Sequence, residues 1–357
     1  MMRYIAMAIG FFGLLASGVP GWADTYYVAS AGDDRNPGTE TQPLRTIQVG
    51  VDRAKPGDTV VVRAGIYHES VVLRRSGTEG KPIIVRNYPD ERPIIEPAGQ
   101  SPGKGFLLQA EEGYQHAIGW ITIEGFEIRR AHDGIKFYNA HDVVIRGNAI
   151  HDNLNQGILG NGHHVHIEGN IIAHNGFQDG NERSNLQHGI YATGTFFTIN
   201  DNVIHSNLAY GIQVAGYDYD PTRHAGPEFA AARHWVIRHN TIAFQQNRAG
   251  IVIWQTDATE CVVEQNIFYR NATHVPSAEQ GIGFVNAGHG HIIRGNVFFA
   301  PDREHVDKAG ENQPEGQYQL VDNLFDQDPQ FVDAEHFDFR LRDGSPARGA
   351  GPEMLPR

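Results

Sequence analysis

Short segments of alternating apolar and polar residues run along most of the chain, and one of them recurs. It is an apolar triplet followed by a polar residue and Asn. The copies, VVIRGN, VHIEGN, FTINDN, WVIRHN, CVVEQN, HIIRGN and a weaker LVDN, end at Asn148, Asn170, Asn202, Asn240, Asn266, Asn296 and Asn323. ITIEGFEI, residues 121–128, is similar to an earlier copy with Phe126 in place of Asn. A period of two is typical of β-strands, so each copy predicts a strand.

Each copy also contains a second and a third short strand pattern. Gly-Ile pairs begin at residues 134, 157, 189, 211, 250 and 281, and alternating residues follow each pair. A third apolar stretch, such as NAI, NII or NVI, comes directly after each Asn. Three short strands per copy, joined by tight turns and repeated in the same order, predict an all-β solenoid, a single-stranded parallel β-helix.

The recurring Asn has a physical explanation in such a fold. Neighbouring rungs lie about 4.8 Å apart, so an Asn at the same inward turn of every coil can hydrogen-bond the Asn above and below it. Asn also tolerates the left-handed backbone conformation of a sharp bend. The alternative, in which Asn only marks surface turns, does not explain its fixed position after the apolar triplet.

The N-terminal region predicts a short capping helix over residues 46–54. Thr46 is a plausible N-cap, and Pro56 would stop the helix. Such a helix would cover the open edge of the first coil, which otherwise exposes unpaired backbone. Residues 58–65, DTVVVRAG, then predict the first full strand.

The first residues predict export. Arg3 precedes an apolar run over residues 5–16, and small residues end at Ala23, so we expect a signal peptide over residues 1–23 and a secreted or periplasmic protein. No later stretch has the roughly 20 apolar residues of a membrane span. Cys261 is the only cysteine, so no intrachain disulfide can form. The net charge of −13 argues against nucleic acid as a partner.

Two segments resemble a known family. YYVASAGDDRNPGTETQPLRTIQVGVDRAKPGDTVVVRAGIYHE, followed by SGTEGKPIIVRNYPDERPII, is similar to the opening of right-handed β-helix proteins of the pectate-lyase-like superfamily, and DPQFVDAEHFDFRLRDGSPARGAG resembles their closing segment. The resemblance implies one right-handed domain over residues 24–357. Its parts would be an N-terminal cap with the first coils (24–120), regular coils (121–325) and a closing segment (326–357). The superfamily includes lyases, epimerases and glycosidases, so the fold alone does not name an activity.

Two insertions indicate where a site would lie. Residues 177–187 precede one Gly-Ile strand and residues 217–234 follow the next, so both should rise beside the same stacked sheet. If each Ile of the Gly-Ile pairs points inward, the next residue points outward. The predicted exposed stack is Lys136, Leu159, Tyr191, Gln213, Val252 and Gly283. The residues before each Gly, whose direction the pattern leaves open, are Asp133, Gln156, His188, Tyr210, Ala249 and Gln280.

Three residues are predicted to be catalytic. His188 and Tyr191 share a strand and could act as base and acid. Lys136, the only lysine between residues 105 and 307, is an alternative base. Each also has a structural explanation, because tyrosine is common on outer sheet faces and Lys136 could simply pair with Asp133.

Other residues are candidates for substrate binding. Arginines could hold a carboxylate, the acidic residues could serve a hydrolase or only a polar loop, and the rest would line the sheet. The predicted set is Arg183, Arg223, Arg248, Tyr210, Gln213, Asp133, Asp218, Asp220 and Trp254. HHVH at 163–166 is the best metal candidate among the 19 histidines, but no ligand set forms around it in the sequence, and we predict no metal site.

Three functions remain open from sequence. A polysaccharide lyase acting by β-elimination on a uronate-containing glycan would use Arg183 or Arg223 for the carboxylate, Lys136 or His188 as base and Tyr191 as donor. A glycoside hydrolase would use Asp133, Asp218 and Asp220, and a non-catalytic module would bind glycans or a periplasmic partner. The resemblance implies that calcium is possible, yet the sequence lacks the dense acidic cluster that would hold it. We expect a monomer whose partner is an extracellular polysaccharide.

Overall fold

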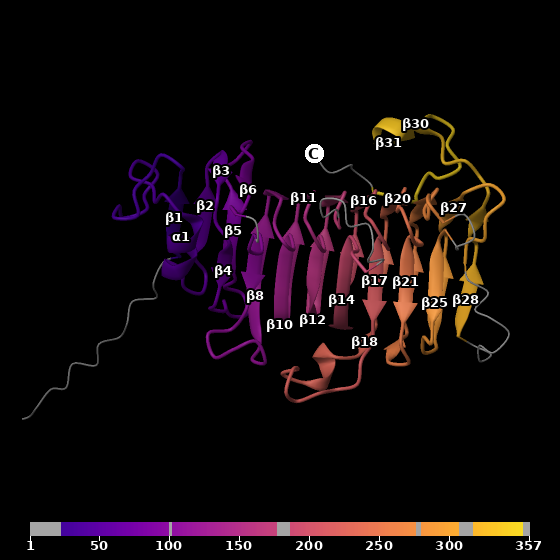
Figure 1. Ribbon diagram of the computed structural model, residues 1–357, viewed down its shortest axis with the longest axis horizontal. Helices are drawn as coiled ribbons and strands as arrows, with labels where there is room; N and C mark the ends of the chain where they lie inside the picture. The colour runs from indigo at the N-terminus through magenta and orange to yellow at the C-terminus, as the bar shows by residue number, and fades with distance from the viewer. Residues whose placement is uncertain (1–22, 100–101, 177–185, 276–279, 307–316, 353–357) are drawn as a thin grey trace, which may run out of the picture.

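The chain forms a solenoid of parallel strands, as the repeats predict (Figure 1). The computed structural model describes residues 23–99, 102–176, 186–275, 280–306 and 317–352. Residues 1–22 of the predicted signal peptide therefore lie outside the described residues. No helix in the described part of the chain has the length and apolar character that crossing a bilayer requires.

Within the described ranges the strands form a 19-stranded sheet, a 10-stranded sheet and a 2-stranded sheet. The largest sheet bends and supplies two faces of the solenoid. The Gly-Ile face contains β4 (Val71–Leu73), β7 (Phe106–Leu108), the first half of β10 (Ile135–Arg146), the first half of β12 (Ile158–Glu168), β14 (Ile190–Thr195), β17 (Ile212–Ala215), β21 (Ile251–Trp254) and β25 (Ile282–Val285).

The triplet face carries the recurring apolar triplets. It contains β1 (Thr25–Val28), β2 (Thr59–Val62), β5 (Ile83–Asn87), β8 (Ile118–Glu124), the second halves of β10 and β12, β15 (Thr198–Asn200), β19 (Val236–Arg238), β23 (Val262–Glu264), β26 (His291–Arg294) and β28 (Tyr318–Val321). The corner strands β18 (Ala232–Arg233) and β22 (Ala258–Thr259) join the two faces.

The third face is the 10-stranded sheet. Its strands are β3 (Gly65–Tyr67), β6 (Pro93–Ile95), β9 (Glu127–Arg129), β11 (Ala149–His151), β13 (Ile171–Ala173), β16 (Val203–His205), β20 (Thr241–Ala243), β24 (Ile267–Tyr269), β27 (Val297–Phe299) and β29 (Leu324–Phe325). The three faces enclose an apolar core in which aromatic rings of successive coils stack, as Phe268 and Phe298 do with ring centroids 4.6 Å apart.

The predicted Asn ladder is present. From Asn148 to Asn323, each Nδ2 donates to the Oδ1 of the Asn one coil further on, at 2.9–3.1 Å, although the coils differ in length from 22 to 38 residues. Phe126 occupies the preceding position, and its backbone N–H donates to Asn148 Oδ1 at 3.0 Å. A second ladder, which we did not predict, runs through Asn153, Asn175, Asn207, Gln245 and Asn271.

The Gly of each Gly-Ile pair is explained by close contact between coils. A Cβ atom on Gly157 would lie 2.6 Å from the carbonyl oxygen of Gly189, and one on Gly189 would lie 2.7 Å from that of Gly211. A side chain at this position would push the coils apart, so the pattern reflects the spacing of the rungs.

Both ends of the solenoid are covered. Helix α1 (Ile47–Arg53) begins after the N-cap Thr46 and packs against β1, β2 and β4, as predicted. The C-terminal strands β30 (Phe331–Asp333) and β31 (Asp338–Leu341), joined by the 3₁₀ turn η2 (Ala334–His336), form an antiparallel pair. This pair packs through Phe331 and Phe339 on the outside of the third face (Figure 1).

Candidate active site

A long excursion, here called the strap (residues 217–231), forms one wall of the site. It leaves the end of β17, contains the 3₁₀ turn η1 (Pro227–Phe229), and returns to the chain at β18. Asn139 of β10 anchors its far end, donating to the carbonyl of Arg223 at 2.9 Å and accepting from the N–H of Ala225 at 3.0 Å. Thr193 donates to the carbonyl of Phe229 at 2.9 Å. The strap therefore extends along the solenoid from the coil of β17 to that of β10 (Figure 1).

A cleft of about 790 Å³, the first cleft, lies between the strap and the Gly-Ile face. Its floor includes Lys136, Leu159 and Tyr191, which are register partners on three successive rungs. The other lining residues come from the strap, from β10, β12 and β14, and from the loop before β8: Tyr114, Phe137, Tyr138, Gly160, Asn161, Thr193, Tyr217, Asp218, Tyr219, Asp220, Arg223 and His224.

Tyrosines dominate the walls of the first cleft. Tyr114 and Tyr138 have ring centroids 5.7 Å apart, and the hydroxyl groups of Tyr191 and Tyr217 are hydrogen-bonded to each other. Burial, followed by the hydrogen bond with Tyr217, raises the pKa of Tyr191, so its phenol stays protonated. Tyrosine rings offer apolar faces for the C–H surfaces of sugars and hydroxyls for their oxygens.

The first cleft contains two cations and two carboxylates. The Nζ of Lys136 lies 5.0 Å from the centroid of the Tyr138 ring, and no carboxylate of the described residues pairs with it. Arg223 has 75% of its side chain exposed, with its Nε 3.5 Å from Asp220. Hydrogen bonds from the side chain and backbone of Thr222 lower the pKa of Asp220, which stays ionised.

The structure brings part of the predicted set together. Lys136, Tyr191, Asp218, Asp220 and Arg223 all line the first cleft. Arg183 lies outside the described residues. The remaining predicted residues do not line it: Asp133, His188, Tyr210, Gln213, Arg248 and Trp254.

Asp133 is a structural residue, and the expected pair with Lys136 does not form. Its carboxylate is fully buried and accepts from Lys104 at 3.1 Å, His132 at 3.0 Å and Asn155 at 2.6 Å. Burial opposes its charge, but His132 and Lys104 hold the pKa of Asp133 below its usual value. Because Asp133 is fully engaged and closed off, the predicted role in substrate binding or hydrolysis is wrong.

His188 is also buried, so the predicted catalytic role is wrong. Only 1% of the residue is exposed, and its Nδ1 accepts from the backbone N–H of Tyr210 at 3.1 Å. Burial, with the charge of Arg248, lowers the pKa of His188 to about 3. Because its imidazole is closed off from the first cleft, His188 cannot reach a substrate proton there.

The reason is a third ladder at the position before each Gly. In three successive coils the side chain at this position turns inward and accepts from the backbone N–H one coil further on: Asp133 from Gln156 at 3.3 Å, Gln156 from His188, and His188 from Tyr210. The predicted exposed stack also ends early, because Gln213 and Val252 are 6% and 2% exposed.

Sequence reasoning missed several lining residues. Tyr138 could have been found, because it follows Lys136 by two residues on the same strand and so faces the same side. Tyr217 and Tyr219 belong to the YDYD sequence from which only the acidic residues were chosen. Tyr114 lies in a loop that carries no pattern.

The described residues of this site do not fit calcium. Among the described residues no group of three or more acidic, His or Cys side chains converges on one point. Asp218 and Asp220 are the carboxylates of the first cleft, and Oδ1 of Asp220 already accepts two hydrogen bonds from Thr222. Calcium binding takes six to eight oxygen ligands, which this arrangement does not supply.

The parallel β-helix with a tyrosine-rich cleft on its outer face belongs to the pectate-lyase-like class of solenoids. Residues 26–218 match the family model described as the Pel9A-like, right-handed beta helix region, so the chain belongs to this family. Residues 175–332 match a model described as a protein of unknown function, DUF1565. The handedness expected from sequence is thereby confirmed.

Known proteins support the same placement. The chain is 29% identical over 210 residues to the uncharacterized protein YwoF of Bacillus subtilis, covering 56% of this chain and 45% of that protein. It is 38% identical over 72 residues to the pectate lyase PEL9 of Emericella nidulans, covering 20% and 18%. The chain thus spans less than half the length of these relatives. The crystal structure of pectate lyase Pel9A superposes with a TM-score of 0.59 at 15% identity, covering 94% of this chain and 88% of that chain.

Proposed function

We propose that this protein is a carbohydrate-active enzyme, a polysaccharide lyase that cleaves a uronate-containing glycan by β-elimination in the first cleft. The observation that carries the proposal is Lys136, which stands on the cleft floor with no carboxylate partner among the described residues. Membership of the Pel9A-like family supports a lyase over other carbohydrate chemistry. The proposed partner is an extracellular polysaccharide, met by a secreted or periplasmic monomer.

The reaction needs a base, a group that neutralises the uronate and a proton donor. In the proposed step Lys136 first releases a proton to solvent; its amine then takes the C5 proton, the C–H electrons form the C4–C5 double bond, and the C4–O bond breaks. Tyr191 gives its phenolic proton to the leaving oxygen. Arg223 pairs with the carboxylate and disperses the charge that develops during proton removal.

The register of the floor suits these roles. Lys136 and Tyr191 are two rungs apart, which places their Cα atoms about 10 Å from each other. A sugar ring fits between two long side chains at that separation, with Leu159 beneath it. The tyrosines of the walls supply stacking surfaces along the cleft.

The test is a panel of polygalacturonate, alginate, glucuronan and neutral glycans incubated with the full chain. Unsaturated products are followed by their absorbance, and reducing ends are counted in parallel. We expect unsaturated product from at least one uronan and a loss of about 10³-fold in kcat for Lys136→Ala. Lys55→Ala changes an exposed lysine just after helix α1 that does not line the cleft; it serves as the matched control and should retain full activity.

Three results would overturn the proposal. Reducing ends without unsaturated product would indicate hydrolysis, with Asp218 and Asp220 as the carboxylates to test. A Lys136→Ala variant that is folded by circular dichroism and fully active would remove the proposed base. If no glycan of the panel is cleaved at all, the lyase assignment is also wrong, and a binding role takes its place.

A further inference from the structure

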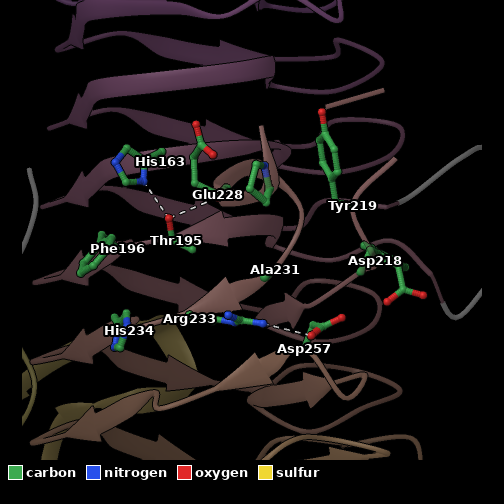
Figure 2. Close-up of a pocket in the computed structure, with 12 residues that line it drawn as sticks. His163, Thr195, Phe196, Asp218, Tyr219, Glu228, Ala231, Arg233, His234 and Asp257 are labelled. Carbon is green, nitrogen blue, oxygen red and sulfur yellow. Dashed lines mark hydrogen bonds and ion pairs between the residues drawn. The ribbon is translucent and has the colours of Figure 1, made fainter. Parts of the chain in front are cut away.

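A second cleft lies on the other side of strap residues 217–219. Its volume is about 380 Å³, and Tyr217, Asp218 and Tyr219 line both this cleft and the first one. Figure 2 shows it at the corner between the Gly-Ile face and the triplet face, with His163, Thr195 and Arg233 along its edge. Thr195 and Arg233 are register partners on adjacent coils.

The second cleft has an exposed aromatic platform. Phe196 and His234 are stacked with ring centroids 4.9 Å apart and an interplanar angle of 27°, and Phe196 is 44% exposed. Both occupy the same left-handed corner position of their coils, with φ near 56° and 58°. Four other described residues at this corner are polar, charged or amphipathic, namely Trp120, Asp142, His164 and Glu260, and the coil after Glu260 has Gly290 there. An exposed Phe here gives no polar contact, yet it offers a flat apolar surface of the kind that a sugar ring covers.

Polar groups surround this platform in fixed orientations. Arg233 pairs with Asp257 at 3.2 Å, and both side chains remain partly exposed at the cleft. Thr195 Oγ1 donates to the carbonyl of Glu228 at 3.2 Å, so it accepts from His163 Nδ1 at 2.7 Å. This chain of bonds assigns the proton of neutral His163 to Nδ1 and leaves Nε2 as an acceptor. Planar charged groups and a fixed acceptor beside an aromatic ring suit ligands with many hydroxyl groups.

The charges of the two clefts differ. In the first, Lys136 and Arg223 balance Asp218 and Asp220. In the second, Arg233 is the cation, whereas three carboxylates line it: Asp218, Glu228 and Asp257. Burial, followed by the neighbouring His164, lowers the pKa of His163, so its imidazole adds no positive charge at neutral pH. A uronate would therefore be repelled, and a neutral sugar would not.

We infer that the second cleft is a separate binding site for neutral sugar units, which stack on Phe196 and His234 and hydrogen-bond to Arg233, Asp257 and His163. Because the strap residues Tyr217–Tyr219 line both clefts, a polysaccharide with a uronate backbone and neutral branches could occupy both at once. Binding in the second cleft does not require the lyase activity.

The experiment measures binding with the full chain carrying Lys136→Ala, so that no substrate is consumed. Isothermal titration calorimetry is carried out with neutral galacto-, arabino- and xylo-oligosaccharides and, for comparison, with oligogalacturonate. We expect at least one neutral oligosaccharide to bind, and Phe196→Ala to weaken that binding at least tenfold. Phe196→Trp, which keeps a flat ring, should restore it, and Val285→Ala, an exposed apolar residue on another coil, should leave it unchanged.

The binding titrations test this inference, and the lyase assay tests the proposed function. The inference is overturned if no neutral oligosaccharide binds, or if Phe196→Ala binds as well as the parent. It is equally overturned if Tyr191→Phe, in the first cleft, abolishes the binding of the neutral sugar to the same extent. Failure of the lyase assay leaves these titrations unaffected, because they report on binding alone.

Discussion

The hydroxyl of Tyr217 on the strap is hydrogen-bonded to the hydroxyl of Tyr191 on β14. The hydrogen bond that raises the pKa of Tyr191 is the one in which Tyr191 donates to Tyr217. In the proposed step Tyr191 turns its proton toward the leaving oxygen and accepts from Tyr217 instead, so Tyr217 is proposed as a positioning residue for the donor. We expect Tyr217→Phe to lower kcat about tenfold with little change in KM, and Tyr191→Phe to lower it about 10²-fold or more. Initial rates of unsaturated product measure both effects.

A purely structural role for Tyr217 would give a different pattern. The Tyr217→Phe variant would then lose thermal stability while its folded fraction kept the parent kcat. Tyr88→Phe, which removes a hydroxyl bonded to Glu40 far from the cleft, is the matched control.

The buried charge of Asp133 supports stability and not catalysis. In Asp133→Asn, Lys104 loses its ionic partner, but it is 24% exposed and can turn toward water. The free energy of unfolding should fall by about 2 kcal/mol while kcat of the folded variant stays unchanged. Urea denaturation gives the first quantity and glycan assays the second. Asp152→Asn, which breaks an exposed pair with His151, should change stability by less than about 1 kcal/mol. Loss of activity in folded Asp133→Asn would contradict this assignment.

The Asn ladder should be costly to interrupt. Asn202 donates to Asn240 and to the carbonyl of Ile167, and its Oδ1 accepts from Asn170, all in the buried interior. Asn202→Ala leaves these partners unsatisfied, so we expect a loss of about 3 kcal/mol or more in unfolding free energy. The nearby Asn200→Ala, outside the ladder, should cost much less in the same urea titration. Equal losses of unfolding free energy in the two variants would show that the ladder Asn contributes no more to stability than an Asn outside the ladder.

His205 should make the protein less stable in acid. Its ring lies beneath the C-terminal segment, stacked on Phe337 at 4.3 Å, and burial, followed by the neighbouring His174, lowers its pKa to about 3. The unfolded state therefore binds a proton that the folded state does not, and stability present above pH 6.5 is lost as the pH falls toward 3. At pH 5 the loss from this residue is about 2 kcal/mol.

The matching variant is His205→Phe, which cannot be protonated. Its unfolding free energy should fall less between pH 7 and pH 5 than that of the parent chain, as measured by urea titration at each pH. His116→Phe, at an exposed position, should leave the slope of the parent unchanged. Parallel slopes for His205→Phe and the parent would contradict the assignment.

Much of the fold could be predicted because a solenoid converts long-range pairing into local repetition. Each Asn of the ladder bonds the same position one coil away, so its recurrence after an apolar triplet encodes register directly. The outward direction of Lys136 and Tyr191 followed from strand alternation for the same reason. The Gly of each Gly-Ile pair marks the contact with the next coil.

The direction of His188 and Asp133 was decided only in three dimensions. Both stand at a bend, where alternation does not apply. Their side chains turn inward because they accept hydrogen bonds from backbone N–H groups of the following coil. The sequence contains no signal for that contact, because it depends on where a turn places a donor.

The amino-acid sequence by itself determined the β-helix, the Asn ladder, the capping helix and the face on which the first cleft lies, because these follow from patterns repeated within each coil. Only the tertiary structure decided which side chains meet there. The strap reaches Asn139 from residues 84 and 86 positions away, and it is held as well by Thr193 and by the bond between Tyr191 and Tyr217; these contacts do not repeat from coil to coil. A contact that occurs once leaves no period in the sequence, so it becomes visible only when the chain is folded.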